Sequence, residues 1–208
     1  MPSATPVVYI VDDDPSVRES LELLIRTEGW RPETFSSADD FLAHPHDPCP
    51  SCLILDVSLP GLNGLDLQKR IADRIETPIV FITGHGDVSQ SVQAMKAGAA
   101  EFLTKPFDSG VLLDAIRNAF RTSQDAIAQA AEIRLLRDRY AALSPREREV
   151  MQLIVAGLLN KQAADQLGIS EITVKAHRGK VMQKMQATSF ADLVKMSIKL
   201  ELVLEARS

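Results

Sequence analysis

Acidic side chains close two apolar runs of this 208-residue chain. Asp12 and Asp13 follow VVYIV, and Asp56 ends CLILDV. A third run, PIVFIT, ends at Thr83, and Lys105 follows AEFLT. Carboxylate oxygens suit Mg²⁺, and a bound cation offsets the repulsion among like charges. A carboxylate beside a metal, a lysine and a hydroxyl can act as a nucleophile toward phosphorus.

The elements that must position these side chains alternate between strands and helices. Strands are predicted over 7–11, 32–35, 52–57, 78–83 and 100–104. Helices are predicted from an Asp14 N-cap to Gly29, briefly after Ser37, and over 65–75, 88–97 and 109–121. This alternation predicts an α/β fold, a doubly wound (βα)5 parallel sheet covered on both faces. In such sheets, functional groups gather beyond the carboxyl ends of the strands.

Charge is unevenly distributed along the chain. Residues 1–121 carry 10 lysines and arginines against 18 aspartates and glutamates, whereas residues 143–208 carry 10 against 7. This asymmetry predicts two domains with different partners. The sequence has no apolar run of membrane-spanning length and no basic-then-apolar start, so we expect neither a membrane span nor a secretory signal. Two cysteines are too few for a disulfide framework and fit a cytoplasmic location.

A different pattern begins after residue 121. Residues 122–142 contain no Gly or Pro and predict a helical linker continuous with the preceding helix, whose apolar positions are more typical of packing than of a coiled coil. Ser144 and Glu147 then form a capping box. Four helices are predicted over 145–156, 161–167, 171–185 and 190–204. The expected organisation is therefore domain 1–121, linker 122–142 and a small all-α four-helix domain over 143–208.

The second and third of these four helices are separated by a Gly-Ile-Ser turn, and Ser170 caps the third. Along that helix Val174, Val181 and Met185 recur on one face. The opposite face carries Lys175, Ala176, Gly179, Lys180 and Gln183. An exposed stripe of this kind can enter the major groove of DNA, although a solvated charged face is the alternative.

The motifs of the first domain match a known family. The Asp-Asp pair after the first strand, LILDVSLPG, ITGHG and FLTKPF occur in the order seen in receiver domains of two-component response regulators, which residues 6–121 resemble. The resemblance implies a flavodoxin-like fold. It also implies that Asp56 is the phospho-acceptor, that Asp13 binds Mg²⁺ (or Mn²⁺) directly and Asp12 through water, and that the Ser58 backbone carbonyl completes the ligands.

The same resemblance assigns the switch. Thr83 would reorient toward the phosphoryl group, Phe102 would move with it, and Lys105 would pair with the phosphoryl oxygens. The Lys105–Pro106 bond is expected to be cis. Related regulators often carry arginine at position 58. Ser58 and His85 therefore leave the lifetime of the phosphoryl group open.

The basic end resembles the LuxR-type helix-turn-helix of the NarL/FixJ response regulators over residues 143–204. The matching stretches are LSPRERE, GLLNKQAADQLGIS and TVKAHRGKVMQKM. The residues expected to contact DNA are Lys161, Thr173, Lys175, Ala176, Arg178, Gly179 and Lys180. Asn160 is expected to be an N-cap, and His177 is expected to pack or hydrogen-bond inside the module.

Together the two resemblances imply a cytoplasmic transcriptional response regulator that is not an enzyme. Its expected partners are a sensor histidine kinase as phosphodonor, double-stranded promoter DNA and, on phosphorylation, a second copy of the chain. RNA polymerase is a further candidate partner. Two alternatives are a Mg²⁺-dependent aspartyl-phosphate phosphatase and a phosphorylation-independent DNA-binding regulator. The sequence after Asp56, VSLP, lacks the D-x-D-x-T pattern of such phosphatases, and the intact acidic set disfavours the second alternative.

The stretch AHPHDPCPSC contains His44, His46, Cys49 and Cys52, all ligand types for Zn²⁺. Cys52 begins a predicted strand and should point into the sheet, and the spacing fits no common zinc module. We therefore interpret the stretch as a proline-rich surface loop, with a zinc site or a redox pair as alternatives.

Overall fold

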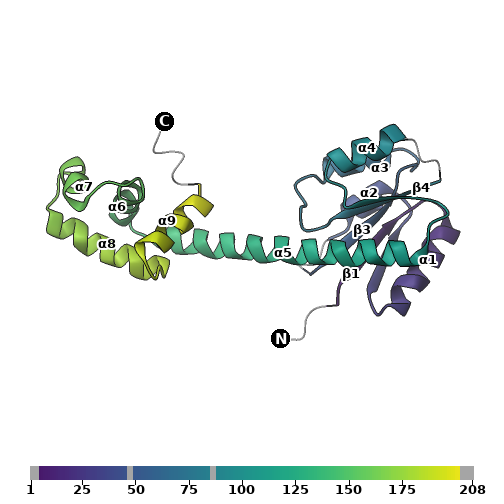
Figure 1. Ribbon diagram of the computed structural model, residues 1–208, viewed down its shortest axis with the longest axis horizontal. Coiled ribbons are helices and arrows are strands. Elements are labelled where there is room, and N and C mark those ends of the chain that lie inside the picture. Colours follow the sequence, from purple (N-terminus) through teal and green to yellow (C-terminus); the bar gives the residue numbers. More distant parts are fainter. Residues whose placement is uncertain (1–4, 46–48, 85–87, 202–208) are drawn as a thin grey trace. The chain divides into compact units, whose positions relative to one another are not determined.

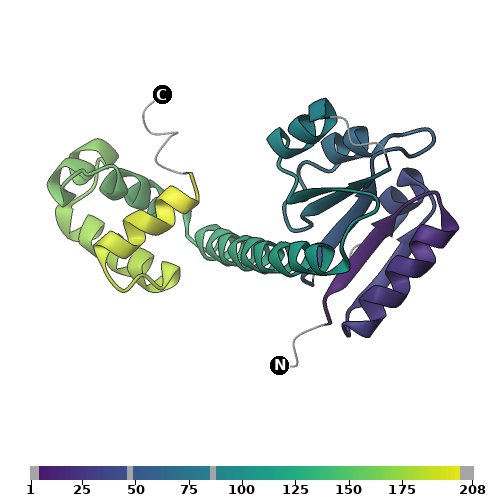
Figure 2. The ribbon, with the colours of Figure 1, turned by 45° about the vertical axis from the view of Figure 1, so that its right-hand side comes forward.

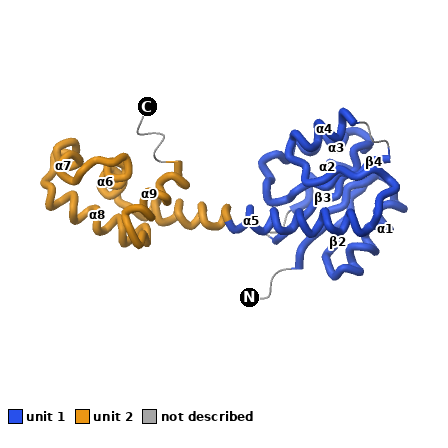
Figure 3. The backbone as a smooth tube through the Cα atoms, in the orientation of Figure 1, with its two compact units in different colours: residues 1–128 blue, residues 129–208 orange. Residues whose placement is uncertain are grey.

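The computed structural model describes residues 5–45, 49–84 and 88–201. The chain divides into two compact units, residues 1–128 and 129–208 (Figure 3). The division falls within one helix, and each unit has its own hydrophobic core.

Unit 1 is built on a five-stranded parallel sheet with strand order β2-β1-β3-β4-β5 (Figure 1). Its strands are β1 (Val7–Val11), β2 (Arg31–Phe35), β3 (Ser51–Asp56), β4 (Ile79–Thr83) and β5 (Glu101–Thr104). The chain adds β2 on one side of β1 and then adds β3, β4 and β5 on the other side. In sheets with such a switch in strand order, a crevice opens at the carboxyl ends of the two strands where the order switches, here β1 and β3. The predicted doubly wound fold is confirmed.

The three central strands, β1, β3 and β4, supply a core on both faces of the sheet because successive side chains point to opposite sides. On one face Tyr9, Leu53 and Phe81 pack under α2 (Ala38–Ala43), α3 (Gly64–Arg70) and α4 (Val88–Lys96). On the other, Ile10 and Ile54 pack under α1 (Pro15–Thr27) and α5 (Ser109–Ala141). Figure 2 shows the ribbons of these helices beside the sheet. Burial on both faces explains why these strands are nearly continuous apolar runs.

Helix α3 is shorter than predicted, since it ends at Arg70 and not near residue 75. The Arg74 N–H donates to the Ile71 carbonyl and the Thr77 N–H to the Arg74 carbonyl, so the chain leaves the helix through successive turns. Pro78 then begins the approach to β4. A proline disfavours helical backbone at the residue before it, and the apolar spacing that extended the prediction carries no such signal.

Helix α5 is continuous through residues 122–141, the segment expected to be a helical linker. Ser123 is fully buried in unit 1, where its Oγ accepts a hydrogen bond from the Ser51 N–H at 2.9 Å and donates one to the Glu76 carbonyl. The first part of this segment therefore stabilises the start of β3. The remainder, from residue 129, belongs to unit 2.

Unit 2 packs α6 (Pro145–Val155), α7 (Asn160–Leu167), α8 (Glu171–Met185) and α9 (Phe190–Lys199) around one core. The predicted capping box is present, since Ser144 Oγ accepts from the Glu147 N–H and the Glu147 carboxylate accepts from the Ser144 N–H. Helix α9 ends five residues before its predicted end at 204, because Leu200 closes it and Glu201 takes a left-handed conformation (φ 60°).

The last part of α5 is an integral piece of unit 2. Leu136 is buried and Tyr140 packs against the core. The Arg139 guanidinium donates to the Met185 carbonyl at 3.2 Å and to the Gln186 side chain at 2.6 Å. Leu136 and Tyr140 thus serve packing, and Arg139 ties α5 to the end of α8.

Candidate functional site

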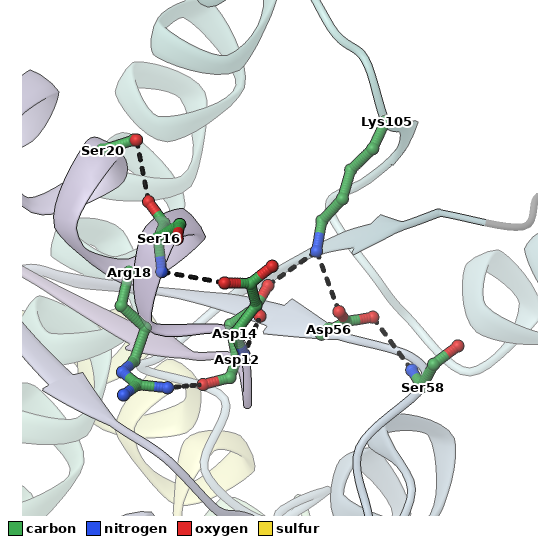
Figure 4. A network of polar contacts seen from close by, with 8 residues as sticks. All are labelled: Asp12, Asp14, Ser16, Arg18, Ser20, Asp56, Ser58 and Lys105. Atoms are coloured by element: carbon green, nitrogen blue, oxygen red, sulfur yellow. Dashed lines mark hydrogen bonds and ion pairs between the residues drawn. The ribbon is translucent and has the colours of Figure 1, made fainter.

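The carboxyl ends of β1 and β3 and the segment after β5 bring together three aspartates and a lysine. One carboxylate oxygen from each of Asp12, Asp13 and Asp56 lies within 4.8 Å of the others. The Lys105 ammonium lies 2.7 Å from Asp12 Oδ2 and 2.9 Å from Asp56 Oδ2 (Figure 4). Residues separated by as many as 93 positions in the sequence therefore share one pocket.

Asp12 forms the floor of this pocket and is fully buried. Its Oδ1 accepts the Asp14 N–H at 2.9 Å and its Oδ2 accepts Lys105. Burial raises the pKa of Asp12, and the nearby Asp56 charge adds to this rise, while the bonds from Lys105 and the Asp14 N–H oppose it. Asp13 is exposed, so one carboxylate faces solvent while its neighbour is enclosed.

Two further hydrogen bonds hold the turn from β1 into α1. The Asp14 side chain caps α1 by accepting the Ser16 N–H at 2.8 Å, which confirms the predicted N-cap. The Arg18 guanidinium reaches back to the Asp12 carbonyl oxygen at 2.7 Å (Figure 4). Sequence reasoning did not single out Arg18. The feature that could have identified it is a basic residue one turn into the helix that follows the three aspartates.

Lys105 is the positive group of the pocket, with a side chain 23% exposed. Burial by itself lowers its pKa, but the bonds to Asp12 and Asp56 outweigh burial and raise the pKa overall, so the ammonium stays charged. The Lys105 N–H donates to the Thr83 carbonyl at 2.7 Å, which joins the segment after β5 to the end of β4. The Lys105–Pro106 bond is cis, as predicted.

The backbone around Asp56 is tightly packed. Asp56 Oδ1 accepts the Ser58 N–H at 2.9 Å, which leaves Oδ2 facing Lys105. Gly64, at the start of α3, lies directly against this segment. A Cβ atom at position 64 would be 2.4 Å from the Asp56 carbonyl oxygen, so only glycine fits. Space is therefore the constraint at position 64.

The predicted switch residues lie on β4 and β5, which follow β3 in the order of the sheet. Thr83 is fully buried at the end of β4. Phe102, on β5, is partly buried, and its ring centroid is 6.1 Å from that of Phe81. Ser58 is exposed, and His85 lies outside the described residues.

The pocket fits a hard divalent cation. Three carboxylates with oxygens within 4.8 Å of one another offer the all-oxygen environment that Mg²⁺ and Mn²⁺ take, and an exposed rim at Asp13 leaves room for retained waters. Lys105 offsets only part of the negative charge of Asp12, Asp13 and Asp56. The donor chemistry and the charge balance both favour such an ion.

The His/Cys stretch does not form a second metal site among its described residues. Cys49 belongs to the core on one face of the sheet, and Cys52 belongs to the core on the other. Burial raises the pKa of the Cys52 thiol, which keeps it protonated. Cys52 is a free thiol, His44 is paired with Glu33 at 2.7 Å, and His46 lies outside the described residues. The described part therefore supports the structural interpretation.

Unit 2 presents the predicted stripe on α8. Gly168 takes the left-handed conformation (φ 64°) that ends α7, and Ser170 caps α8 by accepting the Thr173 N–H at 3.1 Å. Val174, Val181 and Met185 are fully buried, which fixes the rotation of the helix. The opposite face is therefore exposed, and its residues are Lys175, Ala176, Gly179, Lys180 and Gln183.

Several predicted DNA contacts have partners within unit 2. Lys175 forms an ion pair with Glu171 at 3.2 Å, with both side chains largely exposed. The Arg178 guanidinium donates to Asn160 Oδ1 at 3.2 Å and stacks 4.8 Å from the Phe190 ring centroid. Thr173 shares a hydrogen bond with Ser170, whereas Lys161 is exposed in the first turn of α7.

Two predictions for this region need comment. Asn160 is not an N-cap, because α7 begins at Asn160 and Leu159 is the capping position, with its N–H bonded to Gln162 Oε1 at 2.8 Å. The Asn160 side chain binds Arg178 instead, a tertiary contact that sequence spacing does not reveal. His177 is half-buried and its Nδ1 has no hydrogen-bond partner among the described residues, so this residue packs.

Comparison with known proteins identifies a family for each of the two domains. Residues 8–117 match the model of the response regulator receiver domain, and residues 141–197 match that of bacterial regulatory proteins of the luxR family. The chain is 47% identical over 196 residues to Nodulation protein W of Bradyrhizobium diazoefficiens, covering 94% of this chain and 86% of that protein. This chain belongs to the NarL/FixJ family of response regulators.

Two further likenesses cover almost the whole response regulator. It is 44% identical over 206 residues to Response regulator protein TodT of Pseudomonas putida, covering 99% of this chain and 91% of that protein. The solved structure of Response Regulator StyR is 45% identical, covers 94% of this chain and 100% of that chain, and superposes with a TM-score of 0.79. The protein is thus a transcription regulator controlled by phosphorylation of its receiver domain.

The family also defines the classes of partner. A receiver domain takes its phosphoryl group from a kinase, and a luxR-type domain binds DNA. None of the described helices of this response regulator combines the length and apolar character needed to cross a bilayer.

Proposed function

We propose that Asp56 is the residue of this regulator that becomes phosphorylated, and that a phosphohistidine of a sensor histidine kinase is the phosphoryl donor. The observation that carries the proposal is the position of Asp56 Oδ2, which faces the Lys105 ammonium at 2.9 Å and shares a pocket with Asp12 and Asp13. Asp12 and Asp56 each have a second oxygen that accepts a backbone N–H, but the Asp12 side chain is fully buried, whereas that of Asp56 is 8% exposed. One oxygen is positioned while the other remains available for reaction.

In the transfer, an Asp56 carboxylate oxygen forms a bond to phosphorus as the bond between phosphorus and the donor histidine nitrogen breaks. The electron pair of that bond leaves with the imidazole. Lys105 orients the phosphoryl oxygens and offsets their charge. A Mg²⁺ or Mn²⁺ ion held by Asp12, Asp13, Asp56 and the Ser58 backbone carbonyl supplies further positive charge when bound.

Phosphorylation adds about −1.5 to −2 charge and three acceptor oxygens. In the proposed switch, Thr83 and Lys105 form bonds that exist only in the phosphorylated state, and Phe102 repacks with Thr83. Helix α4, β5 and the first part of α5 then change enough to favour receiver dimerisation. The Lys105 N–H bond to the Thr83 carbonyl supports this coupling, because it joins the two segments that must move.

We further propose that α8 reads promoter DNA in the cytoplasm, where the chromosome lies, and that the dimer places two such helices on a two-fold site. Lys175, Ala176, Gly179 and Lys180 lie on the exposed stripe and are assigned to the major groove. Lys161, Thr173 and Arg178 are assigned to phosphates, with Arg178 exchanging its contact to Asn160. Recruitment of RNA polymerase is the proposed output.

The receiver proposal is tested by measuring the intact mass of the full-length protein after incubation with a small acyl phosphate and Mg²⁺. The wild type should gain the mass of one phosphoryl group per chain, and Asp56→Asn should gain none. Asp73→Asn, at an exposed aspartate outside the pocket, is the matched control and should label fully. Labelling of Asp56→Asn would assign the acceptor to another residue, and sustained release of phosphate would favour a phosphatase.

The DNA proposal is tested on duplexes selected from a random pool by the phosphorylated protein. Lys175→Ala should weaken binding by about 1–3 kcal/mol if Lys175 contacts a base. Lys195→Ala, at an exposed lysine on α9 away from the stripe, is the control. Sedimentation of the same samples reports dimerisation, and a phosphorylated protein that remains monomeric would contradict the dimer scheme.

A further inference from the structure

Ile172 is 79% exposed, the most exposed large apolar side chain in the part of the chain that the structure describes. It occupies the second position of α8, directly after Glu171. Single exposed apolar residues are common on protein surfaces. Ile172 differs because of its place on the helix: residues three, four, seven and eight positions apart share a face, and those positions are Lys175, Ala176, Gly179 and Lys180.

Ile172 therefore extends the exposed stripe by one turn toward the start of α8. The three apolar or small residues, Ile172, Ala176 and Gly179, form its centre line, and Lys175 and Lys180 flank it. The buried Val174 and Val181 hold the helix in the rotation that keeps this line outward. Ile172 contributes little to the core, and a β-branched residue is only a moderate helix former. Nothing within the described part of unit 2 explains an isoleucine at this position.

The chemistry of the major groove supplies an explanation. Each base pair presents hydrogen-bonding groups there, and thymine alone adds an apolar group, its C5-methyl. An aliphatic side chain can pack against this methyl group, while the lysines on either side of it can bind the phosphates on either side of the groove. A rise of 1.5 Å per residue places Ile172 about 6 Å along the helix axis from Ala176, which corresponds to about two base steps.

We propose that Ile172 is a specificity-determining residue that packs against the C5-methyl group of a thymine, about two base pairs from the base that faces Ala176. This inference rests on the proposed DNA-binding face of α8 and adds to it the identity of one base. Burying a methyl group contributes about 0.8 kcal/mol, which corresponds to about a four-fold change in affinity.

The experiment uses full-length phosphorylated protein and the duplex that the wild type selects from a random pool. Each thymine of that duplex is replaced in turn by uracil, which removes only the methyl group. The wild type should lose about three- to five-fold in affinity at one thymine per half-site. Ile172→Ala should bind the unmodified duplex about four-fold more weakly and should no longer distinguish thymine from uracil at that position.

Two further variants make the result specific. Ile75→Ala removes an isoleucine of comparable exposure (64%) from unit 1 and should leave both affinities unchanged. Ile172→Gln should select adenine in place of thymine at the same position, because glutamine pairs with the adenine edge. Since Ile172 is exposed, these variants should fold like the wild type, which circular dichroism checks.

The outcomes separate this inference from the function on which it rests. If the wild type selects no sequence, the proposed DNA-binding face itself fails. If it selects a sequence but Ile172→Ala keeps the wild-type response to every uracil, or Ile172→Gln selects the same bases, the assignment of Ile172 is overturned while the DNA-binding face stands.

Discussion

Two buried carboxylates, Asp12 in unit 1 and Glu147 in unit 2, each accept a hydrogen bond from a lysine at 2.7 Å, yet their pKa values shift in opposite directions. Burial raises the pKa of Asp12. The bond from Lys184, together with the Ser144 N–H, lowers the pKa of Glu147 to about 2. Both carboxylates are almost inaccessible to solvent, but burial outweighs the hydrogen bonds at Asp12, whereas the bonds from Lys184 and Ser144 outweigh burial at Glu147.

The two sites also differ in how many negative groups share each lysine, and the Asp56 charge adds to the rise in the pKa of Asp12. Lys105 is divided between Asp12 and Asp56, with Asp13 close by, whereas Lys184 serves Glu147 and the neutral Ala142 carbonyl. Glu147 is therefore fully compensated and stabilises the start of α6. The receiver pocket retains excess negative charge, which an added cation can offset. Imperfect compensation in unit 1 and full compensation in unit 2 separate a functional cluster from a structural one.

Of the changes considered, adding a methyl group at Gly64, next to the Asp56 backbone, should reduce the stability of unit 1 the most. In Gly64→Ala the new Cβ would overlap the Asp56 carbonyl oxygen, 2.4 Å away, so backbone must move. We expect unit 1 to lose about 3–5 kcal/mol of unfolding free energy. Fluorescence of Trp30, the single tryptophan, reports this loss during urea unfolding, because Trp30 packs against Phe120 within unit 1. An unchanged midpoint would show that the loop yields without strain.

Removing the shared lysine should expose the excess negative charge directly. In Lys105→Met, Asp12 and Asp56 lose their cation, and unit 1 should lose about 2–4 kcal/mol without divalent ions. Millimolar Mg²⁺ should restore more stability to the variant than it adds to the wild type. Lys69→Met, at an exposed lysine paired with Asp66, should cost less than about 1 kcal/mol and show no Mg²⁺ effect. Equal losses in both variants would remove the distinction between the pocket and an ordinary surface pair.

Acid should act on unit 2 through Glu147. Its pKa is below the ordinary value, so its stabilising effect is fully present above about pH 5 and is lost as pH falls toward 2. After allowance for screening at the partly exposed Lys184, we expect a loss of about 2 kcal/mol. Hydrogen exchange of α6 peptides should show this loss in the wild type and little of it in Glu147→Gln. Parallel pH profiles for the two proteins would contradict the assignment.

The smallest expected effect concerns Gly179, which differs from Gly64 in having nothing within 4 Å of an added Cβ. Gly179→Ala should stabilise α8 by about 0.5–1 kcal/mol, since glycine is a poor helix former. Hydrogen exchange of α8 peptides measures the gain. If the same variant binds selected DNA more weakly, the duplex approaches α8 closely at Gly179 and the added methyl group prevents this. A destabilised α8 would show that Gly179 has a role in the free module.

Much of this molecule is predictable because its local signals agree with its packing. The central strands are apolar runs because both faces of the sheet are covered. Asp14, Ser144 and Ser170 are capping residues that act on their immediate neighbours. The order of the acidic, threonine and lysine motifs resembled the receiver family, and the Gly-Ile-Ser turn located α8. These signals act over a few residues and so are visible in the sequence.

The misplaced or missed features depend on distant segments. Arg18 binds the Asp12 carbonyl, and Asn160 binds Arg178, 18 positions along the chain. Helix α3 ends early because the chain must turn toward β4. No periodicity or capping rule encodes such contacts. Ile172 was also not singled out, because an apolar residue near the start of a helix looks like a core position until its exposure is known.

The sequence by itself determined which residues could carry the chemistry, because acidic, hydroxyl and basic side chains at strand ends and lysines along one helical face are written in residue type and spacing. Only the tertiary structure decided how charge is shared among them. Whether a lysine serves one carboxylate or two, and whether a glycine adjoins backbone or open space, depends on separations of a few ångströms between segments far apart in the chain. Coulomb and contact energies change steeply over such distances, and residue spacing does not specify them.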